Sequence, residues 1–308
     1  MAEPANAADF VARSEPTQPS GRPVVGGGSA RGSLVDVARD LVRYRELLRE
    51  LTVRDLRIRY KQSVMGVLWA ILTPLVVVLA GAIIRWAFAS LAGGTVAPIE
   101  LGGLAVKSIY WSFFVGALGF GTASLTANLP LVTKVYFPRE LLPISAVLTQ
   151  LVDSAVGCVA LALVFPVYGL GHAIGILWLV PLTMLLFALT TAVALFAACA
   201  NVFYRDAKHV VQLVTSFGIF FTPVFFDLDA FGPAGARAFL LNPLTPLLEG
   251  ARLALMHGHD LREPLVAASG ALTWTPAYLA YAAMWSIGGL LASSLLFRRA
   301  SGRFAEYV

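Results

Sequence analysis

Long apolar runs recur along this chain of 308 residues. Several contain roughly 18 to 22 apolar residues, which is enough for a helix to cross a hydrocarbon core about 30 Å thick. Hydrophobic side chains make up 58% of the sequence, charged ones make up only 13%, and the mean hydropathy is +0.75. Soluble domains do not have this balance. The sequence therefore predicts an all-α, polytopic membrane protein.

Six apolar segments are expected to be transmembrane helices. They lie at about Gly66–Ile84, Gly102–Leu125, Leu141–Phe165, Ile174–Ala200, Val210–Phe226 and Ala277–Phe297. A further tract, Ala238–Met256, is apolar on average but is interrupted by polar residues and prolines. If it crossed the membrane, the basic C-terminal end would lie outside, so we expect a re-entrant helical hairpin that enters from the outer side before the last span. Asn242, Pro243, Glu249 and Arg252 would then lie at an outer gate.

The distribution of basic residues predicts the orientation of the chain. If the spans alternate, one face is flanked by Arg54, Arg57, Arg59, Lys61, Lys134, Arg139, Arg205, Lys208, Arg298, Arg299 and Arg303, and the other only by Arg85, Lys107, Arg237, Arg252 and Arg262. Because Lys and Arg accumulate on the cytoplasmic side, both termini are expected in the cytoplasm of a protein of the cell inner membrane.

The chain divides into three regions by composition. Residues 1–33 are rich in Ala, Pro, Gly and Ser and predict a disordered cytoplasmic tail. Residues 34–64 have apolar side chains at heptad-like spacing, with arginines between them, and predict an amphipathic helix at the membrane interface. Residues 65–308 would form the transmembrane domain. The basic side chains Arg54, Arg57, Arg59 and Lys61 flank the apolar stripe of the interface helix and can extend to lipid phosphates.

No enzymatic site is predicted. The stretch "HGHD" at 257–260 lacks a third metal ligand at matching spacing, and "GGLAVKS" at 102–108 has Val106 where a phosphate-binding loop requires Gly. Cys158 and Cys199 lie in apolar runs and are expected to be buried thiols. We therefore expect no cofactor and no metal in this chain. The net charge of +5 lies beside apolar spans, which favours lipid headgroups over nucleic acid as its partner.

Polar and aromatic residues inside the spans are the remaining candidates. Only Asp153, one turn after Gln150, is expected to place an ionisable group at membrane depth, either as a proton site or in an interhelical hydrogen bond. Phe217, Phe220, Phe221 and Phe225 have the spacing of one helical face. Together with Trp86, Tyr110 and Trp111 they could stack on sugar rings along a substrate pathway or serve only in helix packing; both interpretations stay open.

Several motifs occur in a fixed order along the chain. They are "RDLRIRYKQSVMGVLW" at 54–69 followed by Pro74, "KVYFPRELLP" at 134–143, "NVFYRDAKHV" at 201–210, "TPVFF" at 222–226 and "NPLTPLLEGAR" at 242–252. Together they resemble the permease subunits of type-2 ABC exporters of cell-surface polysaccharides: the O-antigen, capsule and teichoic-acid exporters. The resemblance covers Leu41–Phe297. Met65 stands where the family more often has Leu, and "FFDLD" at 225–229 is more acidic than is usual in the family.

The resemblance implies a half-transporter. Two copies of the chain would form the pathway, and two copies of a separate ATP-binding subunit, which uses ATP and Mg, would drive it. The loop at 128–141 would dock on that subunit through Tyr136, Phe137, Pro138, Arg139 and Glu140. The cargo would be a polysaccharide linked to polyprenyl diphosphate, which Arg54, Arg57, Arg59 and Lys61 could attract. The alternative is that these four residues do no more than anchor the helix at the membrane surface.

Two other functions fit parts of the sequence. A type-2 ABC exporter of a lipid or a drug is compatible with the aromatic face and the hairpin. A membrane-embedded glycosyltransferase would need a catalytic acidic or metal site, which the sequence does not show.

Overall fold

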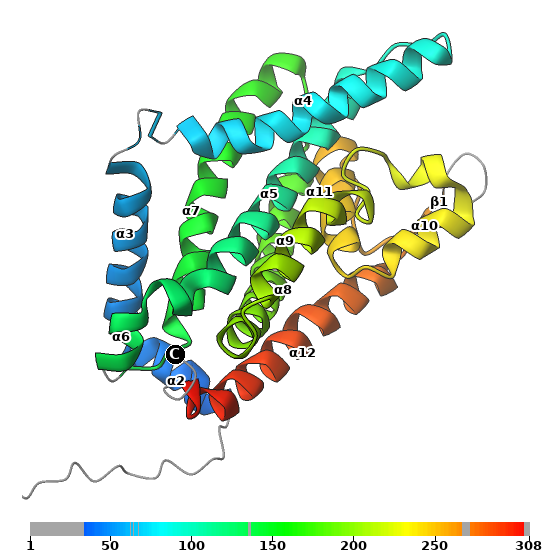
Figure 1. Cartoon of the computed structure of the whole chain (residues 1–308). Helices are drawn as coiled ribbons and strands as arrows, with labels where there is room; N and C mark the ends of the chain where they lie inside the picture. Colours follow the sequence, from blue (N-terminus) through cyan, green and yellow to red (C-terminus); the bar gives the residue numbers. More distant parts are fainter. Residues whose placement is uncertain are drawn as a thin grey trace, which may run out of the picture. The chain divides into compact units, whose positions relative to one another are not determined.

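The computed structural model describes residues 34–61, 63, 65–66, 68–134, 137–266 and 272–304. Most of them are helical (Figure 1). The elements are α2 (Leu34–Arg43), α3 (Arg45–Lys61), α4 (Leu68–Leu91), α5 (Pro98–Ala127), α6 (Leu129–Lys134), α7 (Leu141–Val164), η1 (Phe165–Tyr168), α8 (Ala173–Phe203), α9 (Ala207–Phe217), η2 (Gly218–Phe220), η3 (Leu228–Phe231), α10 (Gly232–Leu240), α11 (Leu244–His257), β1 (Leu265–Val266), β2 (Leu272–Trp274) and α12 (Pro276–Ser301). The predicted tail at 1–33 and Tyr136 lie outside the described residues.

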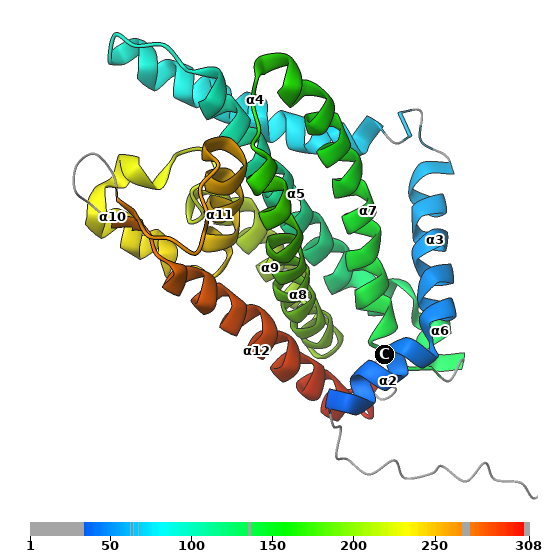
Figure 2. The same cartoon turned by 180° about the vertical axis from the view of Figure 1, so that it is seen from behind.

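Helix α5 is the central element of the bundle. It packs against α4, α7, α8 and α11, and Figures 1 and 2 show it enclosed by its neighbours from both sides. Its side chains Leu104, Phe113 and Leu118 are almost completely buried. A proline at its first turn starts the helix without the need for a backbone donor there. Residues of α5 therefore reach almost every other element of the bundle.

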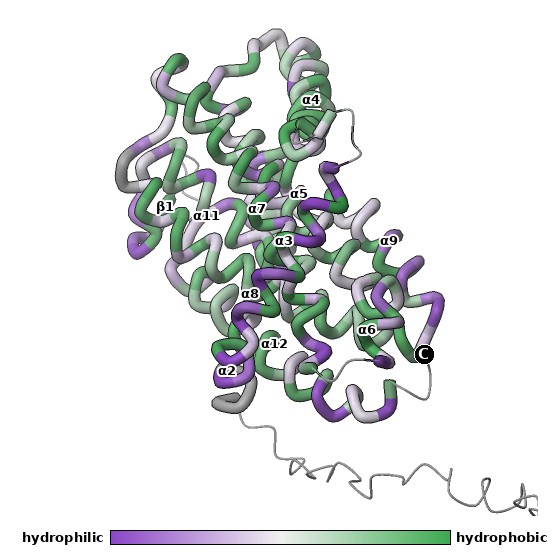
Figure 3. Tube along the Cα trace, turned by 90° about the vertical axis from the view of Figure 1, so that its left-hand side faces the viewer, coloured by the Kyte–Doolittle hydropathy of each residue, from purple (hydrophilic) through white to green (hydrophobic). Residues whose placement is uncertain are grey.

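Five helices in the described part of the chain are long and apolar enough to cross a membrane. They are Leu68–Leu91, Pro98–Ala127, Leu141–Tyr168, Gly175–Phe203 and Pro276–Ser301. Each overlaps one of the predicted spans, so the prediction of a polytopic helical membrane protein is confirmed. Figure 3 shows hydrophobic residues along α4 and α8 and hydrophilic ones gathered on α2 and α3.

The predicted span Val210–Phe226 is not a single helix. Helix α9 ends at Phe217 and is followed by the short 3-10 turn η2 and then by turns and bends. Pro223 explains part of this break, because it cannot donate the hydrogen bond that would extend the helix and it disfavours helical backbone at Thr222. The prediction of one continuous helical face over Phe217–Phe225 is therefore wrong.

Two short helices occupy the tract predicted to contain a hairpin. Helix α10 ends at Leu240 and α11 begins at Leu244, so Asn242 and Pro243 lie at the break between them. Every residue of α11 from Leu244 to Met256 is buried. Gly258, with φ of 62°, ends α11 in the left-handed conformation that glycine adopts without strain. The antiparallel strands β1 and β2 follow, with Leu265 opposite Trp274.

The N-terminal helices are attached to the bundle by their sides. The region predicted as one interface helix contains two helices in its described part, α2 and α3. Helix α3 packs along the first half of α7, and α2 contacts the end of α12. Leu51 of α3 is buried in a second apolar core together with Leu141, Phe297 and Phe304.

Candidate functional site

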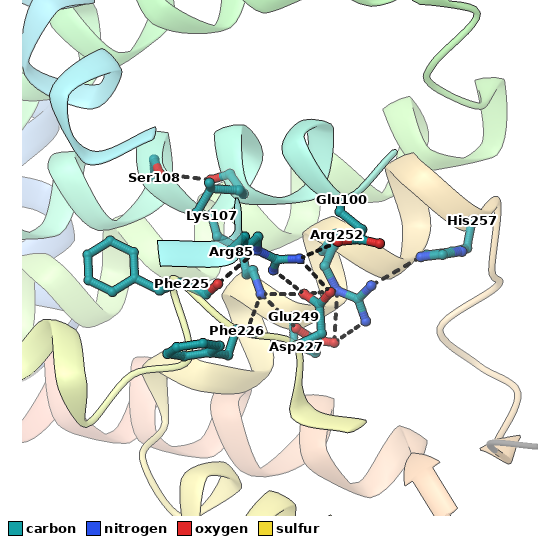
Figure 4. Close-up of polar contacts among 11 residues, drawn as sticks. Arg85, Glu100, Lys107, Ser108, Phe225, Phe226, Asp227, Glu249, Arg252 and His257 are labelled. Carbon is teal, nitrogen blue, oxygen red and sulfur yellow. Dashed lines mark hydrogen bonds and ion pairs between the residues drawn. The ribbon is translucent and has the colours of Figure 1, made fainter. Parts of the chain in front are cut away.

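Five charged side chains meet inside the bundle and form what we call the buried ionic cluster. They are Arg85 of α4, Lys107 of α5, Asp227 before η3, and Glu249 and Arg252 of α11 (Figure 4). Lys107 is completely buried and Glu249 is 2% exposed. Charges this deep require partners, because an unpaired buried charge is very costly.

Asp227 is the hub of the cluster. Its carboxylate accepts two hydrogen bonds from the Arg85 guanidinium, at 3.1 and 3.2 Å, and one from Lys107 Nζ at 2.8 Å. Arg252 Nε lies 3.4 Å from Asp227 Oδ1. The backbone carbonyls of Phe225 and Phe226 accept further bonds from Arg85 and Lys107. The segment after η2 is thereby fixed to α4 and α5.

Glu249 and Arg252 form the second half of the cluster. They lie one turn apart on α11, and Arg252 donates two hydrogen bonds to Glu249 Oε1. Arg252 Nη1 also lies 3.1 Å from His257 Nε2. A guanidinium can only donate, so His257 Nε2 is the acceptor if these two atoms form a hydrogen bond. Glu249 Oε2 has no hydrogen-bond partner among the described residues and lies 3.7 Å from Lys107 Nζ.

The charges of the cluster are nearly balanced. Three cations face the buried carboxylate of Glu249 and the carboxylate of Asp227, whose side chain is 22% exposed, and a third carboxylate, that of Glu100, lies 3.5 Å from Arg85 and is more exposed. Burial alone raises the pKa of Asp227, but Lys107, Arg252 and Arg85 together bring it well below its ordinary value. Asp227 is therefore ionised throughout the physiological range.

Small residues allow α11 to reach this depth. A Cβ on Gly103 of α5 would lie 3.0 Å from Arg252 Cγ, and one on Gly175 of α8 would lie 2.4 Å from the backbone of Ala254 and Leu255. Only glycine permits the second approach, because the obstacle is backbone. These two contacts position Glu249 and Arg252.

The cluster adds buried charges inside the bundle to Asp153, the ionisable group that the sequence predicts at membrane depth. Arg85 and Lys107 were expected beside the spans, yet both lie within α4 and α5. Glu249 and Arg252, which the sequence places at an outer gate, are buried; Arg252 contacts Asp227, and Glu249 lies beside Arg252 and Lys107. One sequence signal could have revealed the cluster. Single charged residues of both signs occur in several separate apolar segments, and such charges can neutralise one another when the segments pack together.

A groove beside the cluster brings several of the predicted aromatic residues together. We call it the aromatic groove; it has a volume of about 530 Å³. It is lined by Trp111, Phe114, Leu189, Val193, Leu213, Val214, Phe217, Gly218, Phe221, Thr222, Asn242, Pro243 and Leu244. Phe217 and Phe221 are more than half exposed. Asn242 closes one end by donating to Thr222 Oγ1 at 3.0 Å and accepting from the Leu244 amide at 3.1 Å.

The other predicted aromatic residues lie outside the groove. Phe225 is buried, with its ring 6.4 Å from that of the exposed Phe220. Tyr110 is buried and its hydroxyl is 2.9 Å from that of Thr183. Trp86 is exposed on α4. Gly218, which follows α9, lies close to the groove residue Trp111: a Cβ at this glycine would lie 2.9 Å from the Trp111 ring.

Asp153 has partners on α3. Arg59 and Tyr60 both donate to its carboxylate, and Arg59 Nη1 also donates to Gln150 Oε1 at 3.2 Å. The Arg59 guanidinium lies 4.1 Å from the centre of the Phe120 ring. Burial and the hydrogen bond to Asp153 raise the pKa of Tyr60 to about 12. Of the two interpretations given to Asp153, these contacts favour the interhelical bond.

The other basic residues of α3 differ in exposure. Arg54 donates to Asp55 at 2.8 Å and to Asn128 at 3.0 Å, which links α3 to the end of α5. Arg57 and Lys61 are exposed. Only part of this basic set is thus free to face a lipid or a ligand.

The predicted docking loop is tied to the C-terminal end of α12. Phe137 is buried in the second core, and Arg139 donates to the carbonyl of Ser301. Glu140 is buried and accepts from Arg298 at 2.9 Å, while Arg298 also reaches Asp40 of α2 at 2.9 Å. Burial raises the pKa of Glu140, and Arg298 partly opposes that shift. Pro138 is half-buried.

Comparison with known families identifies the fold. The model of the membrane domain described as "ABC-2 type transporter" matches residues 46–256. The chain belongs to the ABC-2 type transporter family. This family provides transport subunits whose ATPase is a separate subunit, and the ABC-2 chain described here is a multi-pass inner-membrane protein.

Two relatives of this ABC-2 chain carry the same protein name. An O-antigen export system permease protein RfbA of Myxococcus xanthus is 26% identical over 279 residues, which cover 89% of this chain and 100% of that protein. A protein of the same name from Klebsiella pneumoniae is 25% identical over 214 residues, covering 69% of this chain and 81% of the relative. The similarity therefore extends over most of both proteins.

Proposed function

We propose that this chain is the permease subunit of an ATP-driven exporter that moves lipid-linked polysaccharide, of the O-antigen, teichoic-acid or capsule type, out of the cytoplasm. The observation that carries the proposal is the aromatic groove. Its exposed rings, Phe217 and Phe221, can stack on sugar rings without a fixed hydrogen-bond pattern, and Trp111 and Phe114 line its wall. The names of the two relatives support the same cargo.

In this proposal the chain crosses the membrane six times, with both termini in the cytoplasm. Helix α9 with η2 and the turns up to Phe226 makes the fifth crossing. Helices α10 and α11 form a re-entrant hairpin on the outer side. Helix α11 supports this hairpin, because its 14 residues span only about 21 Å and every residue from Leu244 to Met256 is buried in protein. The buried ionic cluster then holds the hairpin against α4 and α5 as an outer gate.

The proposed assembly has two copies of this chain and two copies of an ATP-binding subunit, which uses ATP and Mg. Residues 128–141 would dock on that subunit, with Phe137 and Pro138 presenting the loop. The bonds of Arg139 and Glu140 to α12 support a transmitting role, since a push on the loop would act on the last span and on α2 at once.

Helices α2 and α3 would lie at the cytoplasmic membrane interface, ahead of the transmembrane domain. Arg57 and Lys61 are the exposed members of the basic set and are the ones available to the diphosphate of a polyprenyl-linked cargo. Arg54 and Arg59 would contribute to the local positive potential while remaining bonded to Asn128 and Asp153.

The test uses the chain co-purified with its ATP-binding subunit and reconstituted into liposomes. Lipid-linked polysaccharide should stimulate ATP hydrolysis, and Phe217→Ala with Phe221→Ala should reduce that stimulation about tenfold while the basal rate is kept. An aromatic contact contributes about 0.5–1.5 kcal/mol, so the loss of two rings is compatible with a change of about tenfold, which is about 1.4 kcal/mol. Val180→Ala, at an exposed residue of α8 outside the groove, is the matched control.

Two outcomes would redirect the proposal. If the polyprenyl lipid without sugar stimulates hydrolysis as well as the complete cargo, the chain is a lipid exporter, the alternative that the apolar side chains of the groove favour. If the variants respond as the wild type does, the aromatic residues serve in packing and the polysaccharide pathway lies elsewhere.

A further inference from the structure

Two neighbouring cavities lie between α3, α4, α5 and α7. One, of about 300 Å³, is lined by a few polar side chains among aromatic and aliphatic ones, and the other, of about 460 Å³, is lined almost entirely by apolar side chains. Pro74, Ile109 and Gly157 line both. Each cavity has the size of a small-molecule site, which is about 300–1,000 Å³. Because they share a wall, one elongated molecule with a polar and an apolar end can occupy both.

The polar cavity offers both signs of charge. Arg59 and Asp153 line it as a bonded pair, together with Tyr60 and Gln150. Ser112 also lines it; this residue is 8% exposed, and its hydroxyl has no hydrogen-bond partner among the described residues. A buried hydroxyl without a protein partner can donate a hydrogen bond to a molecule in the cavity. The rings of Trp69, Trp111 and Phe120 complete the wall.

The apolar cavity continues from this point. Its lining includes Leu75, Val78, Ala105, Leu161, Val164 and Phe165 from α4, α5, α7 and η1. Such a surface suits a hydrocarbon chain, which needs no hydrogen bonds.

From these contacts we propose that the paired cavities bind one zwitterionic phospholipid of the surrounding membrane. The ammonium would bind Asp153 and lie against the aromatic rings, and the phosphate would accept from Arg59 and Ser112. One acyl chain would pass between Pro74, Ile109 and Gly157 into the apolar cavity. A diphosphate fits less well, because Asp153 would repel it and the lining has no surplus positive charge.

The positions along α7 agree with this arrangement. Gln150 and Asp153 line the polar cavity, whereas Ala160, Leu161 and Val164, further along the same helix, line the apolar one. The headgroup would thus lie beside the middle of α7, and the acyl chain would extend toward the C-terminal end of that helix.

Gly157 provides the decisive variant. A Cβ at this position would lie 3.4 Å from Ile109 Cδ1 and 3.9 Å from Pro74 Cγ, which are ordinary contacts, so Gly157→Ala should fit. The larger side chain of Gly157→Leu would fill the passage between the cavities. Ser112→Val replaces the unpartnered hydroxyl with two methyl groups, which enlarges the side chain by one heavy atom, and tests the polar end independently.

The experiment measures retained lipid. The complex with the ATP-binding subunit is purified from membranes supplemented with equal phosphatidylethanolamine and phosphatidylglycerol, washed in detergent, and analysed by native mass spectrometry. We expect the wild type and Gly157→Ala to retain about tenfold more phosphatidylethanolamine than phosphatidylglycerol. We expect Gly157→Leu to retain at least about tenfold less phosphatidylethanolamine than the wild type. Ser112→Val should show a smaller loss. Unchanged elution volume and unfolding temperature exclude misfolding.

Three results would overturn the proposal. They are equal retention of the two lipids by the wild type, unchanged retention in both Gly157→Leu and Ser112→Val, and capture of a polyprenyl diphosphate in place of phospholipid. The last result would assign the cavities to the cargo. None of these readouts depends on export, so a failed transport assay leaves this test intact.

Discussion

The buried ionic cluster and the basic helix α3 use the same residue types in opposite ways. In the cluster, Arg85 and Lys107 donate hydrogen bonds to Asp227 and to backbone carbonyls, and both side chains are buried. On α3, Arg59 is bonded to Asp153 but Arg57 and Lys61 face outward. A closed set of charges holds elements together, whereas an open one remains available to a ligand.

This contrast has an energetic counterpart. Removing one partner from a buried pair leaves an uncompensated charge, which costs about 3–5 kcal/mol. An exposed pair contributes about 0–1 kcal/mol. The two regions should therefore respond very differently to the same kind of substitution.

The largest effect is expected for Asp227→Ala. The substitution leaves three cations facing Glu249 and the partly exposed Glu100, so the unfolding free energy should fall by about 3–5 kcal/mol. Equilibrium denaturation in detergent micelles measures it. Asp260→Ala, in the loop after α11, serves as the matched acidic control and should change stability by about 0.5 kcal/mol or less.

Adding Lys107→Met to Asp227→Ala should raise the unfolding free energy again by about 1–2 kcal/mol. The reason is that a buried cation is replaced by an apolar side chain of similar length. If the double variant is less stable than the single one, Lys107 contributes mainly through Phe226 and not through the charge of Asp227.

For Asp153→Ala, we expect the unfolding free energy to fall by a smaller amount, about 1.5–3 kcal/mol. Arg59 retains 23% exposure of its side chain and can move its charge toward water when the carboxylate is removed, an option that Lys107 lacks. The same denaturation assay measures this variant. A loss equal to that of Asp227→Ala would show that the two regions are equally closed.

The pH dependence should separate the regions further. Since the folded-state pKa of Asp227 lies below its unfolded value, its stabilisation is present above about pH 4 and is lost as the pH falls toward the folded pKa. Between pH 5 and pH 3 the wild type should lose about 1 kcal/mol more than Asp227→Ala. Parallel pH profiles for the two proteins would contradict an ionised Asp227 at the hub.

The smallest change in stability is expected for Arg57→Gln with Lys61→Gln, about 0.5 kcal/mol or less, because both side chains are exposed. Affinity for vesicles that contain anionic lipid should nevertheless fall by about 1 kcal/mol per charge removed. Co-sedimentation of the complex in lipid nanodiscs with such vesicles measures it. Destabilisation without loss of vesicle binding would mean that these residues are structural.

The sequence predicted local features well and distant ones poorly. Apolar length located the spans, and the break at Asn242 and Pro243 located the two short helices. The pairing of Asp153 was among the predicted alternatives. The ionic cluster was missed because Arg85 and Asp227 are separated by 142 positions, and no local period reveals such a contact. Phe225 was misplaced because a single helical period was applied across a segment that Gly218 and Pro223 interrupt.

Arg298 also has a consequence for biosynthesis. It binds Glu140 and Asp40, and 258 positions separate it from the latter. At about 5–20 residues per second, a ribosome would make Asp40 roughly 13–50 seconds before its partner. During that interval Glu140 and Asp40 must remain hydrated or be held by another factor. The junction of α2, the loop before α7 and α12 should therefore be the last part of this chain to mature.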